Sequence, residues 1–275
     1  MSLVYACICP HGTEILPESG DTSNEVVKLR TAMDQLGREM KASSPDVTII
    51  ATPHGLRLEG YNAVVTAEYS SGKVDGPLGT VEAVFRCDRA IAREIVARTR
   101  KAGIPVVGCN YGGLSGPASN MQLDYGALVP LAFFGARDES RPDVVLVGPT
   151  RDIPLAQLVE FGRIIGAIAA QSPKRVAFVA SADHAHTHTA QGPYGFDPAA
   201  ERYDRMIVDI VREDRLEALM DFDLDFVAKA QPDSLWQMLI LYGVSQVVPL
   251  RGRFLAYGLP SYFGMLCASY QPVSE

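Results

Sequence analysis

Two apolar runs of the sequence end in the same short turn, Pro-His-Gly. Residues 3–9 lead into the turn that contains His11, and the β-branched run 46–52 leads into the turn that contains His54. Val, Ile and Thr favour strands, proline restricts the backbone and glycine allows it to turn sharply. Each run therefore predicts a buried strand that stops abruptly at a histidine.

The rest of the chain alternates between strand-like and helix-like stretches. Apolar residues that recur every second residue indicate a strand, and those that recur about every 3.6 residues indicate a helix. Further strands are expected at 63–68, 104–107, 144–147, 175–182, 247–257 and 262–270. Helices are expected at 24–42, 81–102, 153–171, 199–212, 216–230 and 235–242, with loops at 110–119 and 184–198. This alternation predicts an α/β fold, a single domain over residues 1–275 with a central mostly parallel or mixed sheet flanked by helices.

Composition excludes several classes of partner. The formal net charge of −7 offers no clustered positive charge for nucleic acid. Neither a secretory signal nor an uninterrupted apolar stretch of membrane-spanning length is expected, so we predict a cytoplasmic protein with no membrane partner. The cysteines are odd in number and stand mostly in apolar stretches, which favours reduced core thiols: Cys7, Cys9, Cys87, Cys109 and Cys267.

All five histidines fall at predicted strand ends. Besides His11 and His54, three follow the strand predicted for residues 175–182: His184, His186 and His188. Loops at the carboxyl ends of strands converge in α/β sheets, and a rigid turn holds an imidazole at the fixed angle that a metal requires. His11 and His54 are too far apart in sequence for a zinc-finger loop, so they predict a metal site shared by two strand–helix units.

A metal held by two histidines needs a further ligand. Two histidines and one carboxylate, with open positions left over, are typical of oxygen-activating Fe(II) enzymes. Glu14, Asp183 and Asp233 are the candidates for the carboxylate. Asp233 also stands in a Pro-Asp-Ser run before an apolar helix, which is a helix N-cap signal, so its ligand and capping interpretations compete.

Five short segments add a family resemblance. In chain order they are Pro10-His11-Gly12, Thr52-Pro53-His54-Gly55, Leu123-Asp124-Tyr125-Gly126, Ser181-Ala182-Asp183-His184-Ala185-His186 and Gly192-Pro193-Tyr194-Gly195-Phe196. Together they resemble the class III extradiol ring-cleavage dioxygenase superfamily, LigB-type and protocatechuate 4,5-dioxygenase β-subunit-like. The resemblance spans most of the chain in the order that the family has.

The resemblance implies a non-haem Fe(II) dioxygenase that opens a catechol- or aminophenol-like ring with O2 as co-substrate. It implies that His11 and His54 bind the iron. The family's third ligand is a late glutamate, and alignment places Asp233 or Ser234 near that position. We expect Asp233 to take the role.

The resemblance also implies catalytic residues. A histidine that ends the Ser-x-Asp-x-x-His segment acts as acid and base in the family, which corresponds to His186 here. Tyr125 stands where many members carry a histidine that helps to protonate or position the substrate. His184 and His188 are expected either to donate hydrogen bonds to the residues around the metal or, preferably, to be plain loop residues. A small aromatic substrate follows, with a homo-oligomer or a hetero-oligomer that includes a second subunit.

Other classes of function remain open at this point. One is a catalytically silent LigB-like or Memo-like partner or metal-binding protein, because some members of the superfamily have lost catalysis. A Zn2+ hydrolase on the same loops is another, although the sequence has no HExxH helix. A serine hydrolase is disfavoured because the Gly-x-Ser-x-Gly pattern is not present around Ser115.

Overall fold

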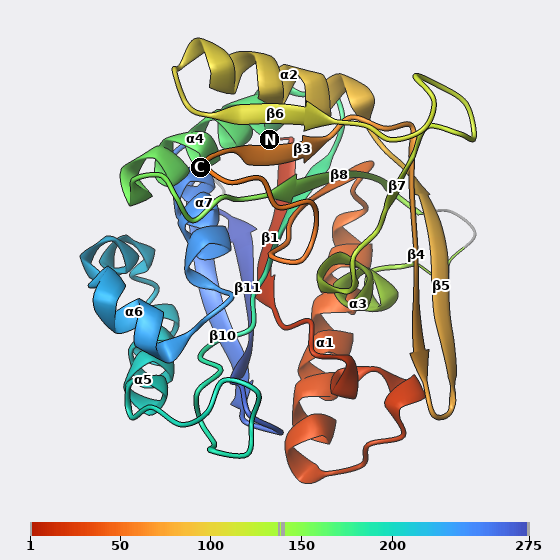
Figure 1. The fold of residues 1–275 in the computed structure, drawn as a ribbon. Helices are drawn as coiled ribbons and strands as arrows, with labels where there is room; N and C mark the ends of the chain where they lie inside the picture. Colours follow the sequence, from red (N-terminus) through yellow and green to blue (C-terminus); the bar gives the residue numbers. More distant parts are fainter. Residues whose placement is uncertain (1, 137, 139–140, 274–275) are drawn as a thin grey trace.

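The centre of the molecule is a mixed sheet of eight strands (Figure 1). In the computed structural model the described residues are 2–136, 138 and 141–273. The strand order is β10-β11-β1-β9-β2-β8-β3-β6. The strands are β1 (Leu3–Cys9), β2 (Val47–Ala51), β3 (Asn62–Val65), β6 (Val106–Cys109), β8 (Asp143–Gly148), β9 (Val176–Ser181), β10 (Leu250–Gly258) and β11 (Met265–Pro272).

The middle of this sheet is parallel and its flanks are mixed. β1, β9, β2 and β8 run in the same direction, whereas β11 and β3 are antiparallel to their inner neighbours. A smaller sheet of order β5-β4-β7 lies beside it and consists of β4 (Tyr69–Gly76), β5 (Gly79–Arg86) and β7 (Asn120–Gln122). The predicted α/β class with a mixed, helix-flanked sheet is confirmed.

Helices cover both faces of the large sheet (Figure 1). They are α1 (Asn24–Ser43), α2 (Arg89–Lys101), α3 (Tyr125–Phe133), α4 (Leu155–Gln171), α5 (Ala199–Arg212), α6 (Leu224–Ala230) and α7 (Leu235–Ser245). Short 3-10 helices form at Thr13–Ile15, Pro17–Ser19 and Leu216–Asp221.

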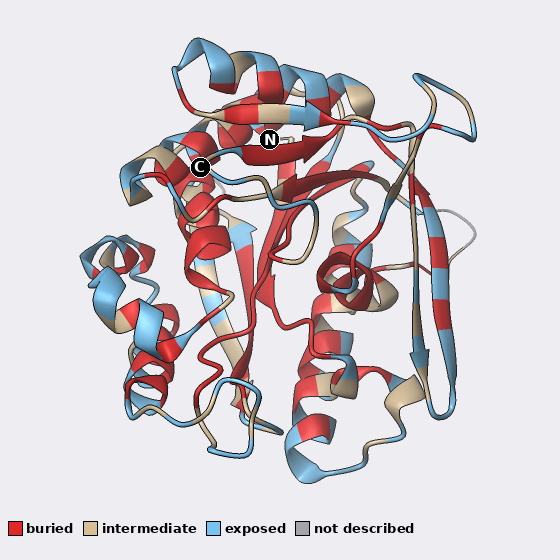
Figure 2. Cartoon of the chain, in the orientation of Figure 1, coloured by how far each residue is buried: buried red, intermediate tan, exposed pale blue. Residues whose placement is uncertain are grey.

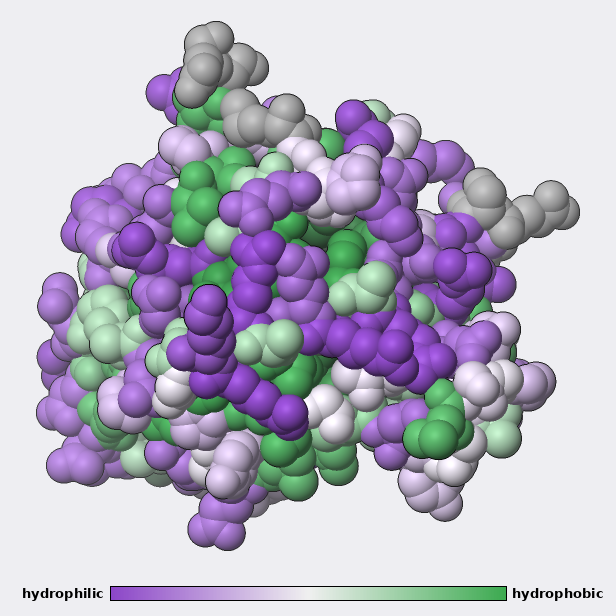
Figure 3. Space-filling model, turned by 90° about the horizontal axis from the view of Figure 1, so that it is seen from above, coloured by the Kyte–Doolittle hydropathy of each residue, from purple (hydrophilic) through white to green (hydrophobic). Residues whose placement is uncertain are grey.

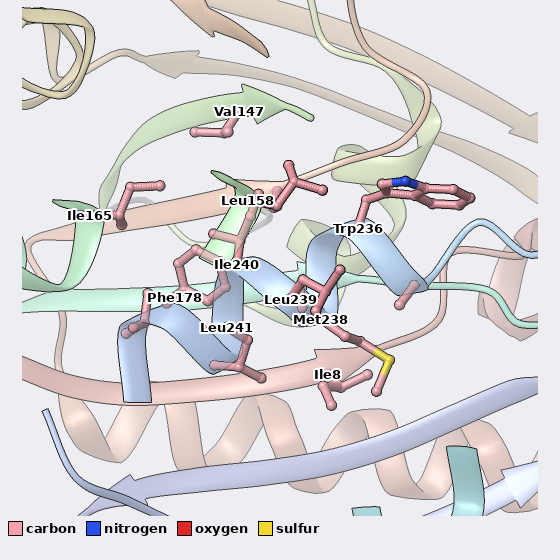
Figure 4. Packing of buried hydrophobic residues seen from close by; sticks show 14 of the residues in the cluster. Ile8, Val147, Leu158, Ile165, Phe178, Trp236, Met238, Leu239, Ile240 and Leu241 are labelled. Atoms are coloured by element: carbon pink, nitrogen blue, oxygen red, sulfur yellow. The ribbon is translucent and has the colours of Figure 1, made fainter. Parts of the chain in front are cut away.

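Strand alternation divides the core into two layers. Ala6 and Ile8 of β1 belong to the core layer that includes α2, α4, α5 and α7, whereas Cys7 and Cys9 point to the other face and belong to the layer that includes α1 and α3. Buried residues accordingly run through the sheet and the inner sides of the helices (Figure 2), and the first layer is densely filled around Ile240 (Figure 4). All five cysteines are free and buried, as the sequence predicts.

Close packing against α4 fixes the position of α7. A Cβ added to Gly162 would lie 2.1 Å from the carbonyl oxygen of Ile240, and one added to Gly243 would lie 2.0 Å from that of Val159. Only glycine lets the two helix backbones approach this closely. Asp233 lies in the linker just before this tightly packed helix.

One predicted helix is partly wrong. Residues 81–102 do not form one helix, because β5 occupies Gly79–Arg86 and α2 begins only at Arg89. Val81 and Phe85 are buried while Glu82 is exposed, which is the period of a strand. Asp88 then caps α2 by accepting hydrogen bonds from the backbone N–H groups of residues 90 and 91.

The helix predicted for residues 216–230 is also interrupted. A 3-10 helix ends at Asp221, and α6 begins at Leu224 with Asp223 as its N-cap. An aspartate that accepts a backbone hydrogen bond in an extended conformation starts a new helix rather than continuing the old one.

The outer surface is mostly hydrophilic when seen from above (Figure 3), with apolar side chains in scattered groups. Among the described residues no helix combines the length and apolar character needed to cross a bilayer.

Candidate metal centre

Three loops meet at the carboxyl ends of neighbouring strands. β1, β9 and β2 are adjacent in the sheet, and they are followed by the segments that contain His11, His186 and His54. The Nε2 atoms of His11 and His54 lie 3.1 Å apart, with their rings edge to face. The structure thus brings together the two histidines that the repeated Pro-His-Gly turns singled out.

His11 is held from all sides. Its side chain is 1% exposed, so it is buried although it stands on a loop. The His11 backbone N–H donates to Oδ1 of Asp183 at 3.0 Å, and Nδ1 lies 2.9 Å from Oγ of Ser181. Chain reversal at the very end of a central strand leaves this turn beneath neighbouring loops rather than at the surface.

The Ser181 hydroxyl fixes the tautomer of His11. Its single proton is donated to the backbone carbonyl oxygen of Gly126, so Oγ can only accept from Nδ1–H of His11. The lone pair of His11 then lies on Nε2, the atom that faces His54. Burial, reinforced by the neighbouring His54, lowers the pKa of His11 well below its usual value. A neutral imidazole with a free Nε2 is the form that binds a metal.

Asp233 completes the cluster. Oδ2 of Asp233 lies 3.4 Å from Nε2 of His54, and one donor atom each of His11, His54 and Asp233 fall within 4.8 Å of one another. Burial acts to raise the pKa of Asp233, but the hydrogen bond with His54 and the charge of Arg151 outweigh it and hold that pKa well below the usual range. The carboxylate is therefore ionised.

The capping interpretation of Asp233 is wrong. Ser234 is the N-cap residue of α7, and no side chain caps this helix. The Asp233 backbone N–H instead donates to the carbonyl oxygen of Asp183 at 3.0 Å. The Asp233 side chain is thereby left to face the histidines.

The other two candidate carboxylates have different surroundings. Oε1 of Glu14 accepts a hydrogen bond from Ser261. Asp183 is buried, and Oδ2 of Asp183 lies 3.2 Å from Nε2 of His11. Burial raises the pKa of Asp183 well above its usual value, with the charges of Glu14 and Asp233 adding to the effect. Opposite pKa shifts on Asp183 and Asp233 indicate different roles for the two carboxyl groups.

His186 is the third histidine near Asp233. Its Nε2 is 3.8 Å from Oδ2 of Asp233, and its ring stacks on Phe263 with centroids 5.0 Å apart. Tyr194 and Tyr262 also pack around this ring. Burial lowers the pKa of His186 despite the opposing charge of Asp233, so the imidazole is neutral and can accept a proton.

Tyr125 stands at the start of α3 and stacks on the His54 ring. Its hydroxyl lies 2.9 Å from Nε2 of His54, and the two rings stack with centroids 4.3 Å apart. Asp124 caps α3 through the backbone N–H of Ala127 and so orients Tyr125. Burial and the nearby carboxylates raise the pKa of Tyr125, which keeps the phenol protonated as a hydrogen-bond donor.

His184 and His188 lie in different surroundings. His184 is fully buried. Nε2 of His188 lies 2.8 Å from Oδ2 of Asp204, and the other oxygen of Asp204 accepts from the backbone N–H of Ala185 at 2.9 Å. Asp204 therefore contacts the segment on both sides of His186, at residues 185 and 188, and fixes its position.

Sequence reasoning assigned no role to Arg151, Ser181 or Asp204. Arg151 lies in the loop between β8 and α4, which is a strand-end position like those of the histidines. The same rule that selected the histidines would have found Arg151 had it been applied to cations.

The comparisons with known proteins identify the family of this chain. Residues 5–260 match the family described as the catalytic LigB subunit of aromatic ring-opening dioxygenase, and the chain belongs to that family. It is 24% identical over 260 residues to protein CA_C1420 of Clostridium acetobutylicum, a match that covers 94% of this chain and 55% of that protein. This chain thus spans only about half the length of that relative.

A solved structure shows the same fold. The uncharacterized protein JW3007 from Escherichia coli K12 superposes with a TM-score of 0.65 over 97% of this chain and 99% of that one, at 17% identity. At this identity the likeness concerns the fold alone.

Proposed function

We propose that this chain is a non-haem Fe(II)-dependent extradiol dioxygenase that opens a catechol- or aminophenol-like ring with O2. The observation that carries the proposal is the convergence of His11, His54 and Asp233. Two imidazoles and one ionised carboxylate fit Fe(II) in charge and donor type. Bound Fe(II) would supply a common binding point for the two adjacent donor atoms of the substrate and for O2, and a path for electrons between them.

His186 is the proposed acid and base. A catechol must lose a hydroxyl proton early in the reaction, and a proton must be returned later. The neutral Nε2 of His186 faces the metal-binding side of Asp233, within reach of a ring held there. One imidazole can accept the first proton and return it in the later step.

The aromatic side chains around His186 are proposed to exclude water and to orient the substrate ring. Phe263 fixes the plane of the imidazole, while Tyr194 and Tyr262 line its other sides. Tyr125 would donate a hydrogen bond towards the substrate oxygens. A phenol that stays protonated is a donor rather than a base, so Tyr125 would position and polarise the substrate.

Turnover by the reconstituted protein tests the proposal. The metal-free chain is loaded with Fe(II) without oxygen and then given O2 with catechol, protocatechuate or 2-aminophenol. One O2 consumed per ring opened is expected, with the absorbance of the ring-opened product as the readout. Full iron occupancy without O2 uptake on these compounds would favour the silent LigB-like or Memo-like partner instead.

His186→Phe separates chemistry from metal binding. Phe preserves the stack on Phe263 but has no proton to exchange, so iron content should stay unchanged while turnover falls about 10²- to 10⁴-fold. A variant that loses its iron would show that His186 is a ligand, and Asp233 would then lose that role.

Assembly and location remain predictions. We expect a homo-oligomer, or a hetero-oligomer with a second subunit, in the cytoplasm, and a single catalytic domain over residues 1–275. Light scattering of the purified chain, alone and after co-purification, tests the oligomer.

A further inference from the structure

Arg151 contacts both ends of the short segment that carries Asp233. Nη2 of Arg151 donates to Oδ1 of Asp233, and the guanidinium carbon lies 4.1 Å from the centre of the Trp236 ring. Trp236 belongs to the first turn of α7 and is almost wholly buried. Arg151 is 31% exposed, so its guanidinium is held against Trp236 while one edge still faces solvent.

The two oxygens of Asp233 consequently have different partners. Oδ1 is bonded to Arg151, whereas Oδ2 lies 3.4 Å from Nε2 of His54 and 3.8 Å from Nε2 of His186. A carboxylate can otherwise turn about its Cβ–Cγ bond and offer either oxygen. With Oδ1 bound by a planar guanidinium that is itself stacked, only Oδ2 faces the histidines.

The backbone of Asp233 does not fix this orientation by itself. Its N–H donates to the carbonyl oxygen of Asp183 at 3.0 Å, which anchors the main chain to the end of β9. The side chain extends from the linker between α6 and α7 and is 15% exposed. Its direction therefore depends on Arg151 and the histidines.

We propose that Arg151 is a positioning residue that holds Asp233 so that the carboxylate binds the metal through Oδ2 alone. This rests on the metal centre of the proposed function. Binding through one oxygen of Asp233 would leave more coordination positions open for substrate and O2 than binding through both oxygens.

The charge of Arg151 and its positioning contact predict opposite changes in metal affinity when Arg151 is replaced. The guanidinium cation repels a divalent metal and draws electron density from the carboxylate, so on charge alone its removal would tighten metal binding. Loss of a positioning contact beside a metal ligand instead weakens binding, typically about 10- to 100-fold. The direction of the change therefore decides between the two.

Cobalt titration without oxygen measures this directly, because Co2+ absorption reports both affinity and ligand geometry and needs no turnover. Arg151→Met should bind Co2+ about 10- to 100-fold more weakly with an altered spectrum, and Arg151→Lys should fall between it and the unaltered protein. Arg98→Met is the matched control, since Arg98 is similarly exposed and ion-paired to Glu94 on α2. Circular dichroism of each metal-free variant checks the fold.

A double variant tests whether Arg151 acts through Asp233. In an Asp233→Asn background, Arg151→Met should change Co2+ affinity little further, because the contact is already weakened. Unchanged or tighter binding by Arg151→Met, or fully additive losses in the double variant, would overturn the proposal. Failure of the unaltered chain to bind Co2+ would also overturn it. Normal Co2+ results without ring opening would instead refute the dioxygenase activity and leave the role of Arg151 standing.

Discussion

His11 and Asp233 point at the same space but are held there by different parts of the fold. His11 ends a central strand, is 1% exposed, and has its backbone and ring bonded to Asp183 and Ser181 of the neighbouring strand end. Asp233 lies on a linker between two helices, is 15% exposed, and is bonded to Arg151. The histidine side of the centre is thus built into the sheet, whereas the carboxylate side depends on side-chain contacts between loops.

Substitutions on the histidine side and on the carboxylate side should differ in their effect on folding. A ligand embedded in the sheet shares its hydrogen bonds with the core, so its loss should affect metal binding and folding together. A ligand on a linker can be altered with little effect on folding. Substitutions at the two sides should therefore separate metal affinity from the free energy of unfolding.

The largest effects are expected from the two histidines. His11→Ala and His54→Ala should each abolish iron binding, because each removes a donor. His11→Ala should also lower the free energy of unfolding of the metal-free protein, by about 1–3 kcal/mol, since it removes the buried ring nitrogens that contact Oγ of Ser181 and Oδ2 of Asp183. His54 has a 22% exposed side chain, so the cost there should be smaller.

Metal analysis and urea unfolding of the two variants measure these effects. Equal stability of both would contradict the view that His11 is structurally embedded and His54 is not. Full iron occupancy in either would remove that histidine from the centre.

A smaller effect is expected from the hydroxyl that sets the His11 tautomer. Ser181→Ala removes the hydroxyl oxygen that accepts the hydrogen bond from Nδ1–H of His11. The neutral ring can then carry its proton on Nε2 instead. Iron affinity should fall about 10- to 100-fold, as for other groups that orient a metal-binding histidine. The measurement is anaerobic Fe(II) titration of the variant.

Ser70→Ala provides the control for Ser181→Ala. Ser70 is also fully buried and donates to a backbone carbonyl oxygen, that of Met121, but it lies in the small sheet. The two variants should lose comparable stability, and only Ser181→Ala should lose iron affinity. Equal iron affinity in both would refute the assigned tautomer.

The smallest effect is expected at Tyr125. Tyr125→Phe keeps the ring that stacks on His54 and removes a neutral hydrogen bond, worth about 0.5–1.5 kcal/mol, which corresponds to a roughly 2- to 12-fold loss of kcat/KM. Iron content should not change. Steady-state kinetics with catechol measures the loss, and a variant that no longer retains iron would assign Tyr125 to the metal side of the centre instead.

The sequence predicts the histidine side of this site better than the carboxylate side. His11 and His54 are found because a strand followed by Pro-His-Gly fixes both position and direction locally. Asp233 is only one of three candidate carboxylates until the family resemblance selects it, since its local signal equally suits a helix cap. The contact between Arg151 and Trp236 depends on how the β8 loop meets α7, which no local pattern encodes.

The misassigned segment shows the same limit. Val81, Val84 and Phe85 have the spacing of a helix face, yet Val84 is exposed while Val81 and Phe85 are buried in β5. Short apolar runs fit both periods, and pairing with β4 decides the outcome. Strand assignment here required knowledge of the neighbouring strand.

Anomalous diffraction at the iron edge, from crystals loaded with Fe(II) without oxygen, tests the account most directly. We predict one iron per chain, bonded to Nε2 of His11, Nε2 of His54 and Oδ2 of Asp233, with Oδ1 of Asp233 still on Arg151. Iron bound through Asp183 in place of Asp233, or no iron between the two histidines, would contradict it.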